Sequence, residues 1–318
     1  MSRRRTTRVG IVGAGVMAEA MIAGLLADRA VDPAALVASH PRRERRDAVA
    51  RTHGIRAVAR NRGAARGAEI VVLAVKPQML AAVMRELAPV LSPEQVVLSI
   101  VAGATLGTLT TGLAHAAVVR AMPNTPAQIR RGITVWAAAA ACTPAQRDLA
   151  RTVLRALGEE RQVTDEGFVA MATALSGTGP TYLFAVMEAL IDAGVHLGFT
   201  RELAHDLVVA TLVGSSEFAA RSDLHPAQLR NLVTSPGGTS AAAIYELERG
   251  RIRTVLSDAV WAAYRRTLEL GERLERETAS ASDDPASMPD ETAGDAGVGA
   301  AHTPARGAAG GPSRGSGS

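Results

Sequence analysis

The feature that most constrains the fold of this chain is a glycine-rich break near its start. An apolar run beginning at Val9 leads into Gly13-x-Gly15-x-x-Ala18 and then changes to a helical pattern. A strand that turns sharply into a helix needs small residues there: Gly13 for the turn, Gly15 for close approach of a diphosphate, and Ala18 for helix–strand packing. The unpaired N–H groups of the helix N-terminus would attract the phosphates. The motif predicts a dinucleotide site, although a tight turn without a ligand has the same pattern.

Strand-like and helix-like segments alternate after this turn. Short apolar runs are predicted as strands at 36–38, 54–58, 69–75, 95–100, 117–122, 132–137 and 160–163. The alternation predicts an α/β domain over residues 8–164, a Rossmann-like doubly wound parallel sheet. Ligands of such sheets bind at the carboxyl ends of the strands. That rule brings Ser39, Lys76, Ala102 and Asn124 to one crevice.

Beyond this domain the pattern is helical only. Helices are predicted at 165–175, 180–197, 200–221, 239–249 and 251–276, which gives an all-α second domain over 165–276. Glycine-rich segments at 176–180 and 234–240 each precede a helix. Residues 1–7 are predicted to be a flexible start. Residues 277–318 are rich in Ala, Ser, Asp, Gly and Pro, which predicts a disordered tail.

The end of the second predicted strand bears on the choice of cofactor. In this fold an acidic residue there binds the ribose hydroxyls of NAD, whereas basic residues accommodate the extra phosphate of NADP. Here Ser39 takes that place, and Arg42 and Arg43 follow, so NADPH is favoured while NADH stays possible. Solvated arginines at a helix start would have the same pattern. Lys76 is the only lysine of the chain, so arginine counts say little about function.

Composition argues against several other classes of protein. Cys142 is the only cysteine, and the seven histidines lack the spacing that places two ligands on one helix face, so we expect no metal. The net charge is +4, but the arginines are dispersed and not interleaved with aromatic residues, so we expect no nucleic-acid partner. No apolar run reaches the ~18 residues of a membrane helix, and Glu19 interrupts the signal-like start. We therefore expect no membrane partner and a cytoplasmic location.

Several short motifs follow one another between residues 8 and 275. They are Gly13-x-Gly15-x-Met17-Ala18, Ala74-Val-Lys-Pro77, Ala102-Gly103, Arg120-x-Met-Pro-Asn-Thr-Pro126, Ser176-Gly-Thr-Gly-Pro180 and Val233-Thr-Ser-Pro-Gly-Gly-Thr-Ser240. In this order they resemble the pyrroline-5-carboxylate reductase family. The resemblance implies reduction of a small cyclic imine carboxylate, 1-pyrroline-5-carboxylate, to L-proline by NAD(P)H. It further implies a homodimer formed by the C-terminal helices, commonly assembled as a decamer of five dimers. An ordinary bundle within one chain would also explain these helices.

The resemblance, together with the glycine turn and the two arginines, yields a set of expected contacts. Those to the cofactor are Gly13, Gly15, Val16, Met17, Ser39, Pro41, Arg42, Arg43, Asn61, Ala74, Lys76, Pro77 and Ala102. Those to the substrate are Ser176, Gly177, Gly179, Pro180, Val233, Ser235, Gly237, Gly238, Thr239 and Ser240. Many relatives have threonine in place of Ser240, which keeps the hydroxyl.

The expected chemistry needs few groups from the protein. Hydride transfer requires alignment and neither a nucleophile nor a metal. The N–H groups at 236–240 suit the substrate carboxylate, although these residues are also ordinary at a helix start. Ser240 is the candidate partner of the imine nitrogen. Lys76 is a candidate acid or cofactor contact, and Asn124 a candidate brace of the nicotinamide or of its own loop.

Two other functions are compatible with these residues. One is an NADP-binding sensor or scaffold without turnover. The other is a reductase that acts on a different cyclic imine or on a deazaflavin. The intact glycine-rich segments at 176–180 and 236–240 favour pyrroline-5-carboxylate reduction over a sensor without turnover.

Overall fold

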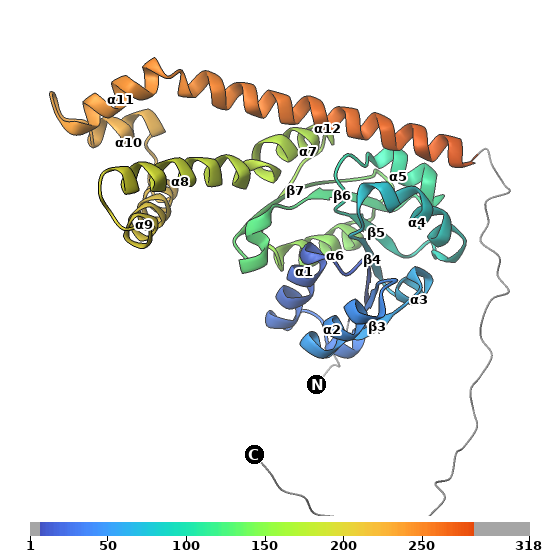
Figure 1. Ribbon diagram of the computed structural model, residues 1–318. Helices are drawn as coiled ribbons and strands as arrows, with labels where there is room; N and C mark the ends of the chain where they lie inside the picture. Colours follow the sequence, from blue (N-terminus) through green and yellow to red (C-terminus); the bar gives the residue numbers. More distant parts are fainter. Residues whose placement is uncertain (1–6, 283–318) are drawn as a thin grey trace, which may run out of the picture. The chain divides into compact units, whose positions relative to one another are not determined.

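The computed structural model describes residues 7–282 (Figure 1). Its described part contains one eight-stranded sheet with the order β3-β2-β1-β4-β5-β6-β7-β8. The strands are β1 Val9–Val12, β2 Leu36–Ser39, β3 Arg56–Val58, β4 Ile70–Leu73, β5 Val96–Ser99, β6 Val118–Met122, β7 Gly132–Ala138 and β8 Gly158–Gln162. The order reverses next to β1, so the carboxyl ends of β1, β2 and β4 border the position where a Rossmann-like sheet binds its ligand.

The prediction of a parallel sheet is right for β1 to β6 and wrong for the last two strands. β7 is antiparallel to β6, with Met122 opposite Val135, and β8 is parallel to β7. The segment 123–131 contains only the short 3₁₀ helix η4, Thr125–Ile129. A parallel connection needs a dozen or more residues, so the chain can return only as an antiparallel neighbour.

Helices cover both faces of the sheet. They are α1 Val16–Ala27, α2 Arg43–His53, α3 Asn61–Ala65, α4 Leu80–Leu87, α5 Leu106–Leu113 and α6 Pro144–Arg155, with short 3₁₀ helices η1 Pro33–Ala35, η2 Pro77–Met79 and η3 Ala88–Val90. Neighbouring strand residues enter different buried clusters: Ile11 packs with Met21 and Trp136, whereas Val12 packs with Leu80 and others. β4 and β5 are buried along their whole length, as expected for runs covered on both faces.

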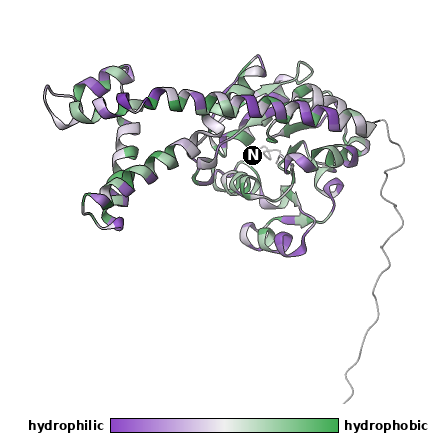
Figure 2. Ribbon diagram, turned by 45° about the horizontal axis from the view of Figure 1, so that its top comes forward, coloured by the Kyte–Doolittle hydropathy of each residue, from purple (hydrophilic) through white to green (hydrophobic). Residues whose placement is uncertain are grey.

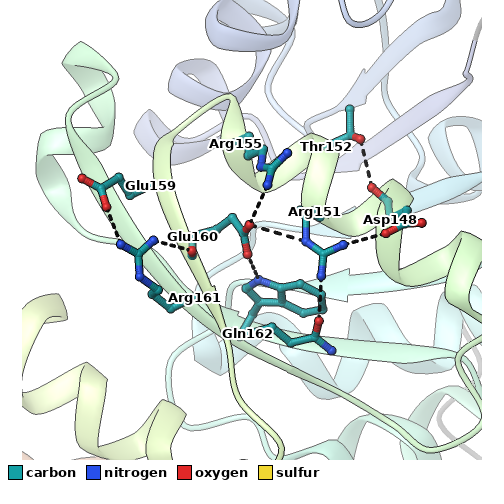
Figure 3. Close-up of polar contacts among 9 residues, drawn as sticks. Asp148, Arg151, Thr152, Arg155, Glu159, Glu160, Arg161 and Gln162 are labelled. Carbon is teal, nitrogen blue, oxygen red and sulfur yellow. Dashed lines mark hydrogen bonds and ion pairs between the residues drawn. The ribbon is translucent and has the colours of Figure 1, made fainter.

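A polar cluster attaches the reversed strands to α6 (Figure 3). The indole N–H of the fully buried Trp136 donates to Glu160 over 2.7 Å. Arg151 lies with its guanidinium carbon 5.5 Å from the Trp136 ring centroid and its Nε 3.5 Å from the Glu160 carboxylate. Arg155 reaches the same carboxylate oxygen at 3.3 Å. These contacts join β7, β8 and α6.

The rest of the described chain is helical, as predicted. After α7 Gly167–Ala172, a π-helical turn η5 at Thr173–Gly177 leads into α8 Gly179–His196, which is followed by α9 Arg201–Ala220, α10 Pro226–Leu232, α11 Thr239–Arg249 and α12 Ile252–Ser282. The sequence reading missed α10, and α12 continues beyond the predicted start of the tail at 277 (Figure 1). Of the predicted flexible start at 1–7 and disordered tail at 277–318, residues 1–6 and 283–318 lie outside the described part.

These later helices expose many large apolar side chains. Figure 2 colours the ribbon by hydropathy, and hydrophobic residues, in green, recur along these helices. Leu197 is 81% exposed, Tyr245 67%, and Phe184 and Trp261 57% each. Exposed apolar side chains of this size and number are typical of an interaction surface. No helix between residues 7 and 282 is both long and apolar enough to cross a membrane.

Candidate dinucleotide and substrate site

The glycine turn has the geometry that a diphosphate site needs. Gly13 adopts a φ of 95°. A Cβ atom on it would lie 2.6 Å from the carbonyl oxygen of Ala74, so no larger residue fits. A Cβ on Gly15 would meet no atom within 4 Å, and no side chain caps the start of α1. The N–H groups of the first turn of α1 therefore face open space that suits an anion.

Arg45 holds this turn from the side, and the sequence analysis did not single it out. Its Nε donates to the carbonyl oxygen of Ala14 over 2.7 Å, and its terminal nitrogen pairs with Glu19 at 2.7 Å. The first contact joins α2 to the loop between β1 and α1, and the second joins α2 to α1. Arg45 is one arginine in a run of them, and nothing in the local pattern distinguishes it.

The structure brings together the two polar residues expected near the adenosine ribose. Ser39 ends β2 and is fully buried, and its hydroxyl lies 2.8 Å from Asn61 Oδ1 at the start of α3. The amide nitrogen of Asn61 donates to Glu86 of α4 over 2.6 Å. Glu86 is a second residue that sequence reasoning missed, because it lies more than twenty residues from its partner in the chain.

A cationic group follows β2. Arg42 and Arg43 are exposed; Arg43 lies 3.6 Å from Asp47, and Arg42 forms no ion pair within the described residues. Arg46 donates to the carbonyl oxygens of His40 and Pro41 over 2.9 and 2.7 Å. Burial, followed by the positive charges of nearby arginines including Arg42, lowers the pKa of His40 from its usual value. The exposed guanidinium groups are placed where an additional phosphate would be attracted.

The expected contacts after β4 and β6 differ in character. The carbonyl oxygen of Ala74 lies against Gly13. The exposed Lys76 directly precedes η2, which begins at Pro77. The Oδ1 atom of Asn124 accepts the backbone N–H of Ile133 over 2.9 Å. Asn124 therefore braces the turn between β6 and β7, the second of the two roles expected for it.

The first glycine-rich segment of the helical part lies against the end of β6. A Cβ on Gly177 would be 3.0 Å from the terminal methyl of Met122. The hydroxyl of Ser176 donates to the carbonyl of Ala172 over 3.0 Å within the π-helical turn. Turns of this kind are frequent at functional sites. Gly177 thus lies beside Met122 at the end of β6.

A buried ion pair holds this junction in place. Arg120 of β6 has a side chain that is only 7% exposed and lies 2.7 Å from the Glu166 carboxylate. The same Glu166 oxygen accepts the backbone N–H of Leu106 at the start of α5 over 2.9 Å. One carboxylate therefore connects β6, α5 and the residue before α7.

The second glycine-rich segment, residues 234–240, makes its side-chain hydrogen bonds with nearby residues and not with the expected cofactor contacts. Ser240 lies in the first turn of α11, behind Gly237, which has a φ of 70°, and Gly238, the N-cap. No side chain caps this helix. In the part of the chain that the structure describes, side-chain hydrogen bonds and ion pairs of residues 225–253 stay within that range. One copy of the chain thus does not bond this segment to the cofactor crevice.

Comparison with known proteins places this geometry in a family. Residues 166–270 match a family model described as pyrroline-5-carboxylate reductase dimerisation, and residues 8–103 match one described as NADP oxidoreductase, coenzyme F420-dependent. A pyrroline-5-carboxylate reductase of Synechocystis is 39% identical over 84% of this chain and 99% of its own length. The chain belongs to the pyrroline-5-carboxylate reductase family. A second family member, from Pseudomonas aeruginosa, is 41% identical over 85% of this chain and 98% of its own length.

Solved reductases of this family share the fold. The pyrroline-5-carboxylate reductase of Coxiella burnetii superposes with a TM-score of 0.78 at 36% identity, covering 84% of this chain and 99% of its own. The enzyme of Plasmodium falciparum, solved with NADP bound, has a TM-score of 0.77 at 29% identity, with 83% and 98% covered. The family and the fold class predicted from the sequence are thereby confirmed. Oligomerisation through the helical part is supported by the dimerisation model.

No group of three or more His, Cys, Asp or Glu side chains within residues 7–282 is arranged to hold a metal ion. Two features of the residues that would hold NAD(P)H fit this cofactor. Gly15 borders open space that a Cβ would enter, and the first turn of α1 has N–H groups without a side-chain cap.

Proposed function

We propose that this chain reduces 1-pyrroline-5-carboxylate to L-proline with NAD(P)H, the last step of proline biosynthesis. The observation that carries the proposal is the open, uncapped start of α1 behind Gly13, within a chain of this reductase family. When bound, NAD(P)H supplies the hydride for the C=N carbon. The backbone from Gly13 to Met17 would hold the diphosphate. Ser39, Asn61, Arg42 and Arg43 would hold the adenosine end.

The remaining contacts would surround the nicotinamide and the substrate. Ala74, Lys76, Pro77 and Ala102 follow the ends of β4 and β5 and would line the nicotinamide side. The uncapped N–H groups at the start of α11 would hold the substrate carboxylate. The Ser240 hydroxyl would bind the imine nitrogen, directly or through water. Residues 176–180 would close the site from the end of β6.

We propose that two copies form the complete site. The 233–240 segment makes its side-chain bonds only with nearby residues, while large apolar side chains of the same helices are exposed. Burial of these side chains in a homodimer would stabilise the pair and bring the 233–240 segment of one copy toward the crevice of the other. Further assembly into five dimers and a cytoplasmic location remain predictions.

Steady-state oxidation of NADPH and NADH, with and without 1-pyrroline-5-carboxylate, tests the proposal. Substrate-dependent oxidation with formation of proline is the expected result. Tight NADPH binding without turnover would indicate a sensor instead. Oxidation only with another cyclic imine or with a deazaflavin would indicate a different reductase.

A further inference from the structure

A chain of three polar side chains lies at the adenosine end of the crevice. Ser39 comes from the end of β2, Asn61 from the start of α3 and Glu86 from α4. Ser39 Oγ is 2.8 Å from Asn61 Oδ1, and Asn61 Nδ2 is 2.6 Å from Glu86 Oε2. The other carboxylate oxygen of Glu86 accepts the backbone N–H of Arg62 over 3.2 Å. Ser39 is fully buried, and Asn61 and Glu86 are half-buried.

The carboxylate determines the direction of every hydrogen bond in this chain. An ionised carboxylate only accepts, so the amide nitrogen of Asn61 must face Glu86 and its oxygen must face Ser39. The single hydroxyl proton of Ser39 is then used to bond Asn61 Oδ1. Because Ser39 is fully buried, with its hydroxyl also 3.5 Å from the carbonyl oxygen of Ile11, the half-buried Asn61 is the residue of this pair that a ligand can reach. Its Oδ1 atom keeps one lone pair for a ligand and has no proton to donate.

This polarity distinguishes the two cofactors. A free ribose hydroxyl can donate a proton to such an acceptor, whereas a ribose phosphate is itself an acceptor and does not donate. The charge of Glu86 also repels a phosphate. We propose that Glu86 is a positioning residue that sets the hydrogen-bond polarity of the ribose subsite and moderates the preference of the exposed arginines for NADPH. This inference rests on the proposed binding of NAD(P)H in this crevice.

The substitution Glu86→Gln reverses the polarity with little change in shape. A glutamine satisfies both neighbours if its oxygen accepts from Arg62 N–H and its nitrogen donates to Asn61. The Asn61 amide must then rotate, so that its nitrogen donates one proton to Ser39 and has a second proton free for a ligand. The Ser39 proton keeps the carbonyl oxygen of Ile11 as its acceptor. Because the negative charge also disappears, both changes favour a phosphate. One hydrogen bond to a charged group corresponds to about a tenfold change in Kd.

The experiment measures the Kd values of NADPH and NADH for the full-length protein by fluorescence of the reduced nicotinamide. We expect the ratio of the NADH Kd to the NADPH Kd to rise about tenfold in Glu86→Gln. Arg85→Gln is the matched control, because Arg85 is the exposed neighbour in the same helix. Its ratio should equal that of the wild type. In Asn61→Ala the further change Glu86→Gln should have a smaller effect, since the rotating amide is absent and only the loss of the Glu86 charge acts.

The outcomes separate this inference from the proposed function. An unchanged ratio in Glu86→Gln, with wild-type thermal unfolding and with both cofactors still bound, overturns the role of Glu86 alone. Failure of the wild type to bind either cofactor overturns the proposed function. If Glu86→Gln does not fold, Asn61→Ala decides: loss of the acceptor should weaken NADH binding more than NADPH binding, and equal weakening overturns the inference.

Discussion

Alanine substitutions at the two glycines of the turn should have different effects on the free energy of unfolding. Gly15 has a φ of −81° and a ψ of −179°, an extended backbone that any residue adopts, and its Cβ would meet no atom within 4 Å. Gly15→Ala should leave the free energy of unfolding unchanged or raise it by about 0.4–1 kcal/mol. Gly13→Ala combines a φ of 95° with a Cβ 2.6 Å from the Ala74 oxygen. The backbone strain alone costs about 1–3 kcal/mol, so a loss of about 3 kcal/mol is expected with the overlap.

Cofactor affinity should respond to Gly15→Ala even though stability does not. The added methyl group fills the space through which a diphosphate approaches the N–H groups of α1. Loss of one charge-assisted hydrogen bond costs about 1.5–3 kcal/mol, which raises the Kd of NADPH by about 10- to 150-fold. Chemical denaturation gives the stability, and nicotinamide fluorescence gives the Kd. A Gly15→Ala protein with wild-type affinity would refute the placement of the diphosphate.

Three further variants test other parts of the site. Arg42→Ala together with Arg43→Ala should raise the KM for NADPH far more than that for NADH, and equal effects would exclude a phosphate contact. Ser240→Ala should lower kcat by about 10- to 1,000-fold while the cofactor Kd stays constant; unchanged turnover would remove Ser240 from the reaction centre. Glu166→Gln leaves the buried Arg120 without a counter-charge, which should cost about 2 kcal/mol of unfolding free energy; a loss below about 0.5 kcal/mol, the range of ordinary surface substitutions, would contradict a structural role for the pair.

Features with a local physical cause were predictable from the sequence. Gly13 signals the turn because a larger residue does not tolerate its backbone conformation. Gly15 signals the turn because a larger residue would not leave the space beside it open. The β-branched runs of β4 and β5 signal strands buried on both faces. For the helix α10, a signal was present but overlooked: Pro226 stands in its first turn, and Gln228 completes a capping box with His225. Segment 123–131 is likewise too short for a parallel crossover, so its length in the sequence indicates that β7 runs antiparallel to β6.

Other features depend on contacts between distant parts of the chain. Glu86 and Arg45 act on residues more than twenty positions away, so no local pattern reveals them. The end of α12 is another case, since its last turns have the composition of a loop. A Cβ on Gly112 of α5 would lie 3.0 Å from the Thr278 methyl group. Packing against α5 therefore extends the helix where propensity alone would end it.

The contact between Gly103 and Gly271 limits how this chain can change during evolution. Gly103, after β5, has a φ of 82°, and a Cβ on it would lie 3.2 Å from the backbone nitrogen of Gly271 in α12. A Cβ on Gly271 would in turn lie 3.1 Å from the Gly103 oxygen. Each inserted or deleted residue rotates a helix by about 100°. A single-residue insertion or deletion between the start of α12 and Gly271 would thus turn a bulkier neighbour toward this loop, so we expect homologous chains to vary in length elsewhere.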